Sequence, residues 1–345
     1  MQDTALETLF LPFAEGRLSW PENGALFLRA RDGLPLREHS FPGLVCEQTF
    51  KPEFDALKRA GFSVQNDTQV TAKFPLVLIL PPRQRDEARA LLARAVECTS
   101  AGGRVVAAMS NNEGARSGEA DLSRLAGAVE VASKNKCRVF WTPPLNGAAD
   151  SSLLAQWSTL DAPRPIEGGR FISRPGIFAW DRIDIASALL AKHLPKDLAG
   201  TAADLGAGFG YLSAELLERC AGITAVDLYE AEKRALDLAE RNLSSSEQRR
   251  TLRFRWHDVT SGLLAKYDVI VTNPPFHAQR GVDRPDIGRR FISVAAEALN
   301  DRGRLWLVAN RHLPYESVLA SEFARVRTIA EQHGFKIVEA VKRAA

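Results

Sequence analysis

Short apolar runs alternate with stretches of helical periodicity along this chain. Residues 74–82 and 267–275 each predict a buried strand that ends in Pro-Pro. Residues 104–109 and 304–309 predict further buried strands, each of which follows a helix and a glycine turn. The tail 334–341 predicts the last strand of an antiparallel hairpin. Strands that alternate with helices are typical of the α/β class, in which the sheet is mostly parallel.

These elements recur at nearly constant spacing, which predicts two copies of one unit. Phe74 and Tyr267, which begin the two Pro-Pro strands, are 193 positions apart, whereas Gly103 and Gly303 are 200 positions apart. The second copy is therefore longer by seven residues just after its Pro-Pro, where an insertion can build a substrate-binding loop. A chance similarity between two α/β units is the alternative explanation.

A domain boundary is predicted within residues 145–169, which are rich in Pro, Gly, Ser and Ala. A chain of 345 residues is long for one core and sufficient for two. We therefore predict one domain over residues 1–160 and a second over residues 161–345. The first 150 residues contain no acidic-Gly-x-Gly-x-Gly turn, so the first domain is expected to be a degenerate copy without a cofactor, kept for packing or RNA binding.

The composition, 45% hydrophobic and 25% charged, is that of a soluble globular protein. The longest apolar run, 74–82, is too short to cross a bilayer, and no secretory leader is evident, so a cytoplasmic protein without a membrane partner is expected. The four cysteines form no CxxC pair or grouping with His, which argues against a metal site. A net charge of +3 does not by itself indicate a nucleic-acid partner.

Residues 201–217 place a glycine-rich turn between a strand and a helix. The predicted strand ends at Asp204, and Gly206, Gly208 and Gly210 lead into the helix. Glycine lets the backbone turn sharply and approach a ligand closely. The free N–H groups of the following helix attract a phosphate or a carboxylate. We predict that Asp204 and the three glycines bind a nucleotide-containing cofactor.

Acidic residues end the next two predicted strands. Asp227 lies seventeen residues after Gly210, and it and the following Leu228 are expected to bind the cofactor, with Asp227 accepting the ribose hydroxyls. Asp258 is expected to accept the adenine amino group, with the amide of Val259 facing a ring nitrogen. These positions suit either a dinucleotide or S-adenosylmethionine.

The segment Asn273-Pro274-Pro275-Phe276 follows the fourth predicted strand, at the edge where open α/β sheets bind ligands. An amino group on an aromatic ring is a poor nucleophile because its lone pair is delocalised. The Asn273 side-chain oxygen and the Pro274 carbonyl can each accept one of its N–H groups, and the prolines fix both acceptors in advance. Phe276 can stack on the base. We predict a methyltransferase for a base amino group, with Asn273, Pro274 and Phe276 catalytic and Asn273 also beside the cofactor S-adenosylmethionine.

The chain resembles the bacterial ribosomal-RNA guanine-N2 methyltransferases of the RsmC type. The resemblance rests on DLGAGFG (204–210), NPPFH (273–277), RLWLVANRHLPYE (304–316) and SRPGIFAWDRIDIASALL (173–190), and more weakly on GGRVVAAMSNNEGARS in the first half. It implies two tandem class I methyltransferase folds, Rossmann-like, of which only the second keeps its motifs. It also implies methyl transfer to N2 of one guanine in ribosomal RNA, more specifically 16S RNA of the small ribosomal subunit.

Several residues near the Asn-Pro-Pro motif are candidates for holding RNA, because phosphate contacts dominate affinity for nucleic acid. The candidates are the arginines Arg280, Arg284, Arg289 and Arg290, with His277 and Tyr315 as further substrate contacts beside Phe276. A second arginine run comprises Arg249, Arg250, Arg253 and Arg255. A solvated, ion-paired surface is the alternative for both runs, and core packing is the alternative for Tyr315.

Other functions remain compatible with the sequence. Adenine N6 or a protein glutamine amide are alternative methyl acceptors, because both are handled by related Asn-Pro-Pro-aromatic motifs. A nicotinamide-dependent reductase would leave Asn-Pro-Pro-Phe unexplained. A non-catalytic RNA-binding protein would leave the whole motif set unused. Two domains in one chain reduce the need for a dimer, so a monomer is expected.

Overall fold

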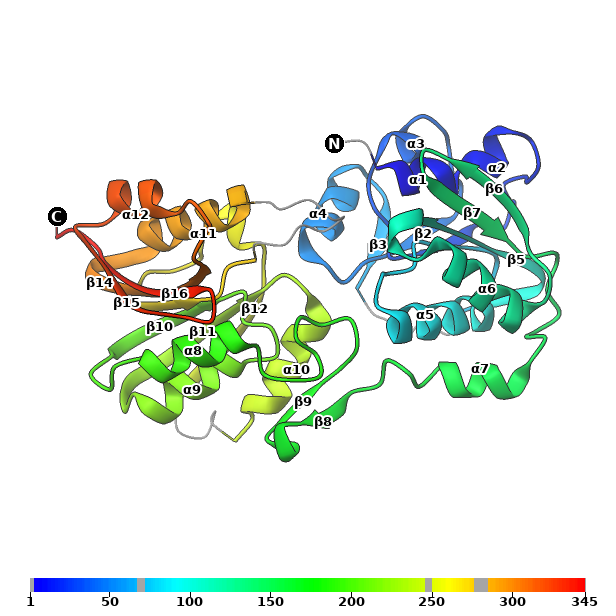
Figure 1. Ribbon diagram of the computed structural model, residues 1–345. Helices are drawn as coiled ribbons and strands as arrows, with labels where there is room; N and C mark the ends of the chain where they lie inside the picture. The colour runs from blue at the N-terminus through cyan, green and yellow to red at the C-terminus, as the bar shows by residue number, and fades with distance from the viewer. Residues whose placement is uncertain (1–2, 67–71, 246–249, 276–284, 345) are drawn as a thin grey trace. The chain divides into compact units, whose positions relative to one another are not determined.

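The computed structural model describes residues 3–66, 72–245, 250–275 and 285–344. The chain divides into two compact units (Figure 1). The first comprises Met1–Pro163 with Arg174–Gly176, and the second comprises Arg164–Ser173 with Ile177–Ala345.

The first unit is built on a seven-stranded sheet with the strand order β3-β2-β1-β4-β5-β7-β6. The strands from β3 to β5 are parallel to their neighbours, and β7 pairs antiparallel with both β5 and β6. The strands are β1 (Ala25–Leu28), β2 (Leu44–Glu47), β3 (Ser63–Gln65), β4 (Phe74–Ile79), β5 (Thr99–Ser110), β6 (Glu130–Lys134) and β7 (Cys137–Trp141).

Helices cover both faces of this sheet because alternate strand residues point to opposite sides. Leu26 and Val77 face one layer, whereas Phe27 and Leu78 face the other. The first layer contains α5 (Arg85–Glu97), α6 (Ala115–Ala126) and α7 (Ser151–Trp157). The second contains α1 (Thr4–Leu9), α3 (Leu34–Arg37) and α4 (Lys51–Arg59). The short α2 (Leu11–Ala14) and η1 (Asn111–Glu113) complete the unit.

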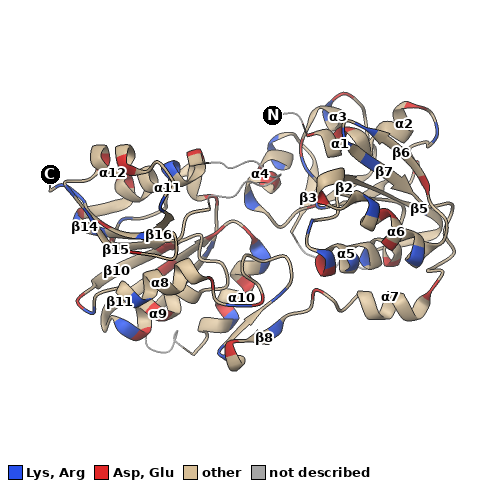
Figure 2. Cartoon of the chain, viewed as in Figure 1, with Lys and Arg blue, Asp and Glu red and all other residues tan. Residues whose placement is uncertain are grey.

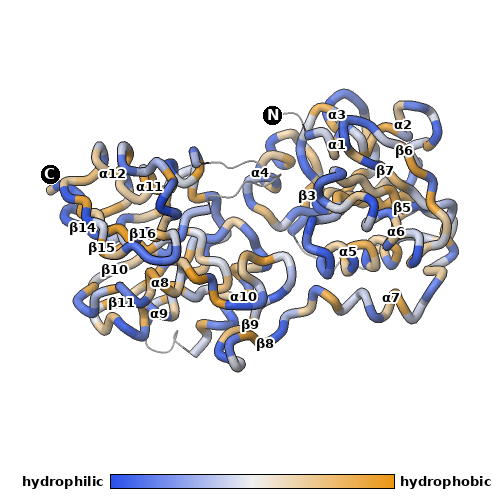
Figure 3. The backbone as a smooth tube through the Cα atoms, viewed as in Figure 1, coloured by the Kyte–Doolittle hydropathy of each residue, from blue (hydrophilic) through white to orange (hydrophobic). Residues whose placement is uncertain are grey.

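The second unit repeats the same sheet, in the order β12-β11-β10-β13-β14-β16-β15. Its first five strands are again parallel, and β16 runs antiparallel to β14 and β15. The strands are β10 (Ala199–Leu205), β11 (Gly222–Glu230), β12 (Thr251–Trp256), β13 (Tyr267–Thr272), β14 (Leu299–Asn310), β15 (Arg325–Gln332) and β16 (Phe335–Val341). The fully buried positions concentrate in the central strands, which coincide with apolar segments of the chain (Figure 3).

Two helical layers enclose this second sheet as well. One layer holds α8 (Ile185–His193), α9 (Tyr211–Arg219) and α10 (Lys233–Leu243), and the other holds α11 (Pro285–Ala298), α12 (Glu316–Glu322) and the turn η3 (Val259–Ser261). A hairpin of β8 (Arg164–Ile166) and β9 (Phe171–Ser173), joined by η2 (Glu167–Gly169), packs through Phe171 on Phe209. Basic and acidic residues are mixed along α9 and α10 (Figure 2).

The predicted fold class and duplication are confirmed by these two sheets. Strand β4 begins at Phe74 and β13 at Tyr267, and β5 and β14 begin at Thr99 and Leu299, which reproduces the spacings found in the sequence. The seven additional residues of the second copy fall between β13 and α11. The last predicted strand is β16, in an antiparallel hairpin. Among the described residues no helix combines the length and apolar character needed to cross a membrane.

Candidate active site

Three neighbouring strands of the second unit end at the same edge of the sheet. Leu205, the last residue of β10, pairs with Tyr229 of β11 on one side and with Thr272 of β13 on the other. The Thr272 hydroxyl donates to the Leu205 carbonyl at 2.8 Å. The glycine turn after β10 and Asn273 after β13 therefore leave the sheet side by side. This is the edge where α/β sheets bind ligands.

The glycine turn depends on backbone conformations that only glycine adopts readily. Gly206, Gly208 and Gly210 have φ values of 74°, 56° and 91°. A Cβ on Gly210 would lie 3.2 Å from the Ala239 side chain, so this glycine lets α10 approach closely. A Cβ on Gly208 would meet nothing within 4 Å. Of the three predicted glycines, Gly210 therefore permits helix packing and Gly208 borders open space.

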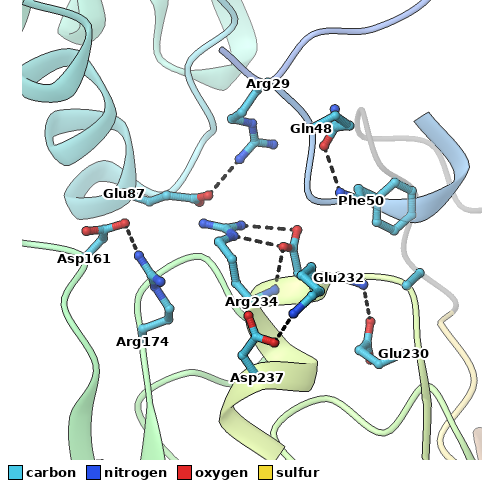
Figure 4. A network of polar contacts seen from close by, with 12 residues as sticks. Arg29, Gln48, Phe50, Glu87, Asp161, Arg174, Glu230, Glu232, Arg234 and Asp237 are labelled. Atoms are coloured by element: carbon cyan, nitrogen blue, oxygen red, sulfur yellow. Dashed lines mark hydrogen bonds and ion pairs between the residues drawn. The ribbon is translucent and has the colours of Figure 1, made fainter. Parts of the chain in front are cut away.

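The acidic residue beside this turn is Glu230, at the end of β11 (Figure 4). Its Oε2 accepts from the Gly208 amide at 2.8 Å, and its Oε1 accepts from the Glu232 amide at 2.7 Å. Burial raises the pKa of this carboxyl, and the two amide bonds oppose the rise. Glu230 thus holds its carboxyl group directly against the glycine turn.

Asp227, predicted to end this strand, lies three residues earlier and is 2% exposed. Its carboxylate accepts from Arg253 at 3.0 Å, from Arg255 at 3.3 Å and from the Tyr267 hydroxyl at 3.1 Å. The predicted strand end was wrong, because β11 continues to pair with β12 as far as Glu230. Asp227 therefore holds two arginines to the sheet, and Leu228, which follows it, is fully buried in the core.

Asp204, predicted to end β10, lies at its next-to-last position and is fully buried. Its Oδ2 accepts from the Ser213 hydroxyl of α9 at 2.8 Å, and its Oδ1 has no hydrogen-bond partner among the described residues. Burial raises the pKa of this carboxyl to about 7. An unsatisfied buried acceptor costs free energy unless a ligand or water bonds to it.

The raised pKa of Asp204 predicts a pH-dependent contribution to stability. Between about pH 4 and 7 the folded state holds this proton and the unfolded state does not, so stability falls as the pH rises, by at most about 1.4 kcal/mol per pH unit. We expect Asp204→Asn, which cannot ionise, to gain stability relative to the wild type over that range. Urea unfolding without cofactor at several pH values tests this, and a difference that stays constant with pH would contradict it.

Asn273 is held in one orientation by α8. Its Nδ2 donates to Asp184 Oδ2 at 3.0 Å and to Ser187 Oγ at 2.9 Å. With the amide nitrogen occupied by two acceptors, the side-chain oxygen is left as the group that can accept from a substrate. Pro274, which follows, is buried, and Pro275 is exposed.

The predicted adenine-binding residues lie at the end of the neighbouring strand. Asp258 follows β12, and its Oδ1 accepts from the amide and the hydroxyl of Thr260 at 2.9 and 2.7 Å, so it caps the turn η3. Val259 is buried, 3% exposed. His257 is held by the Gly262 carbonyl at 2.7 Å, which is a structural position. The role predicted for Asp258 and Val259 toward adenine stays a prediction.

The remaining substrate-binding candidates differ in whether the structure describes them and in whether they are exposed. Phe276, His277, Arg280 and Arg284 lie outside the described residues, as does Arg249. Arg289 is exposed, whereas Arg290 donates to the Thr260 carbonyl at 3.0 Å and to Glu297 at 2.9 Å. Tyr315 is fully buried in the core against Gly288. Its position agrees with the packing alternative.

Asp184, Ser187 and Glu230 are not singled out by the sequence alone. Asp184 carries a usable signal, because it precedes an apolar helical run and occupies the N-cap position, where its side chain accepts from the Ser187 amide. Glu230 carries none, since nothing in the run 225–230 marks which residue ends the strand.

Comparisons with known proteins bear on both units. The model of the methyltransferase small domain family matches residues 168–339. A ribosomal RNA small subunit methyltransferase C of Psychromonas ingrahamii is 27% identical over 84% of this chain and 82% of its own length. The protein of the same name from Salmonella paratyphi A is 27% identical over 90% of each chain. The matches to these two relatives extend through both units, whereas the family model matches within the C-terminal half. This chain belongs to the RsmC family.

The fold of this RsmC family member agrees with a solved relative. A 16S rRNA N2 methyltransferase (RsmC) of T. thermophilus, solved in complex with AdoMet and guanosine, superposes with a TM-score of 0.81 and 24% identity. The alignment covers 99% of this chain and 92% of the other. The tandem arrangement of two α/β units is therefore that of the RsmC fold.

Proposed function

We propose that this protein transfers a methyl group from S-adenosylmethionine to the exocyclic N2 of a guanine in 16S ribosomal RNA. The observation that carries the proposal is the fixed amide of Asn273 beside the glycine turn. Family membership supports the same activity, because the relatives are small-subunit RNA methyltransferases.

The residues of the second unit fit S-adenosylmethionine. Gly208 borders open space, which lets a ligand approach the backbone. The buried Oδ1 of Asp204 is an acceptor without a partner among the described residues, and it suits a cationic group such as the ammonium of the methionine moiety. Glu230 presents a carboxylate at the strand end, where it can accept ribose hydroxyls. When bound, the cofactor supplies a reactive sulfonium methyl group.

The protein's part in the reaction is to orient the guanine amino group. The Asn273 Oδ1 and the Pro274 carbonyl each accept one N–H, which favours a pyramidal nitrogen with its lone pair directed at the methyl group. The prolines limit backbone motion, so the acceptors are aimed before the substrate binds. Phe276 stacks on the base in this proposal. In-line positioning supplies much of the rate, and no strong base is needed.

We propose that the first unit is a degenerate copy that binds no cofactor. Where the second unit has the nine-residue α9 after its glycine turn, the first has only the four-residue α3. The Gln48 amide occupies the corresponding strand end and donates to the Ala30 carbonyl at 2.7 Å. Arg29, just after β1, pairs with Glu87 at 2.8 Å (Figure 4). The remaining role of the first unit is RNA binding or packing. We expect the whole protein to be a cytoplasmic monomer.

Transfer of tritium from labelled S-adenosylmethionine to small ribosomal subunits that lack the modification tests this proposal. Nucleoside analysis is expected to recover the label as N2-methylguanosine. Label recovered as N6-methyladenosine would identify adenine as the methyl acceptor in place of guanine. Label recovered in protein glutamine would identify a protein acceptor. Failure to bind S-adenosylmethionine at all would contradict the enzymatic proposal as a whole.

A further inference from the structure

The side-chain amide of Asn273 is held by the first turn of a helix that is distant in sequence. Asp184 is the N-cap of α8 and Ser187 lies in its first turn. Both accept from Asn273 Nδ2, at 3.0 Å to Asp184 Oδ2 and at 2.9 Å to Ser187 Oγ. Each of the two amide hydrogens therefore has its own acceptor.

These partners permit only one orientation of the amide. A carboxylate has no hydrogen to donate, so a flipped Asn273 would place its oxygen against the Asp184 oxygen. The flip would exchange an attractive, charge-assisted bond for a repulsive contact. Bonds from the amide nitrogen to a carboxylate also polarise the amide, which makes its oxygen a better acceptor.

The support is itself rigid. Asp184 Oδ2 also accepts from the Ser187 amide at 2.8 Å, so this carboxylate cannot turn away from Asn273 without uncapping the helix. Leu189 and Leu190 bury α8 in the core, 6% and 0% exposed. The orientation of the amide is thereby tied to the packing of a whole helix against the sheet.

We infer that Asp184 and Ser187 are positioning residues, which set the Asn273 oxygen to accept from the substrate amino group. The catalytic consequence of this inference rests on the proposed function. The orientation of the amide rests only on its hydrogen bonds to Asp184 and Ser187. An amide free to rotate would present the wrong group part of the time and would need to reorient during the reaction, which lowers kcat.

Three variants separate positioning from structural support. Ser187→Ala removes one acceptor but keeps the backbone amide that Asp184 caps. Asp184→Asn keeps an oxygen acceptor without the charge, and Asp184→Ala removes both the acceptor and the cap. Asp150→Ala is the matched control, since Asp150 caps α7 by accepting from the Leu153 amide at 2.9 Å in the first unit.

The expected effects on methyl transfer to unmodified small subunits are confined to kcat. We expect Asp184→Ala to lower kcat about 10- to 100-fold and Ser187→Ala a few-fold, with affinity for S-adenosylmethionine unchanged. Asp184→Asn is expected to lie between Asp184→Ala and the wild type, because it keeps an oxygen acceptor but loses the charge and can also donate to a flipped Asn273. Asp150→Ala is expected to lower the Tm and leave kcat unchanged. If Asp184→Ala and Ser187→Ala keep the wild-type kcat, or if their kcat falls only together with cofactor affinity, positioning is overturned.

A second measurement decides the inference even if the RNA substrate is wrong. Hydrogen exchange of the Asn273 side-chain amide, followed by NMR, is expected to be slow in the wild type and fast in Ser187→Ala and Asp184→Ala. Fast exchange in the wild type would overturn the inference. Slow exchange in a wild type that methylates no RNA would contradict the proposed function and leave the positioning intact.

Discussion

Replacing Asn273 by Ala is expected to lower the kcat for methyl transfer about 100- to 1000-fold, comparable to the loss of one preorganised group that stabilises a transition state. The variant lacks the oxygen that accepts from the substrate amino group as the nitrogen becomes pyramidal. Affinity for S-adenosylmethionine, measured by calorimetry, is expected to change much less than kcat. Single-turnover methylation of unmodified small subunits is the direct measurement.

Asn300→Ala provides the matched control for this experiment. Asn300 lies in β14 of the second unit and, like Asn273, donates its side-chain amide to a carboxylate, Asp268 Oδ1 at 2.8 Å. It lies near the start of β14, whereas Asn273 follows the end of the parallel β13. Its loss is expected to leave kcat unchanged. A kcat above one tenth of the wild type in Asn273→Ala would mean that the amide is not the principal acceptor.

Replacing Glu230 by Ala is expected to weaken the binding of S-adenosylmethionine about 100-fold. Two hydrogen bonds from ribose hydroxyls to a carboxylate together contribute about 3 kcal/mol, which corresponds to about two factors of ten in Kd. Glu230→Gln keeps an acceptor for the Gly208 amide and is expected to lose about tenfold. Equilibrium binding of the cofactor in the absence of RNA measures both.

Two other acids serve as comparisons for Glu230. Glu232→Gln removes the same charge two residues away and is expected to bind the cofactor normally. Asp227→Asn is expected to destabilise the fold, since it disrupts bonds with Arg253 and Tyr267, while affinity in the folded protein stays near the wild type. Loss of affinity in Asp227→Asn, but not in Glu230→Ala, would return the ribose role to Asp227.

The sequence predicts the features that neighbouring residues determine. Apolar runs and Pro-Pro ends place β4 and β13, and their recurrence predicts the duplicated fold. The glycine turn at 206–210 is equally local, because three positive φ values within five residues strongly favour glycine at those positions. Asn273-Pro274 is recognisable because the prolines that follow Asn273 restrict the backbone of the motif.

Only the tertiary structure decides the features that depend on partners distant in the sequence. The end of β11 is set by pairing with β12, which is why the acid beside the glycine turn is Glu230 and why Asp227 is buried among arginines. The orientation of Asn273 is set by Asp184, 89 positions earlier. Local sequence determines which elements form and which groups they carry, whereas hydrogen bonding between strands and helix packing determine where each group points.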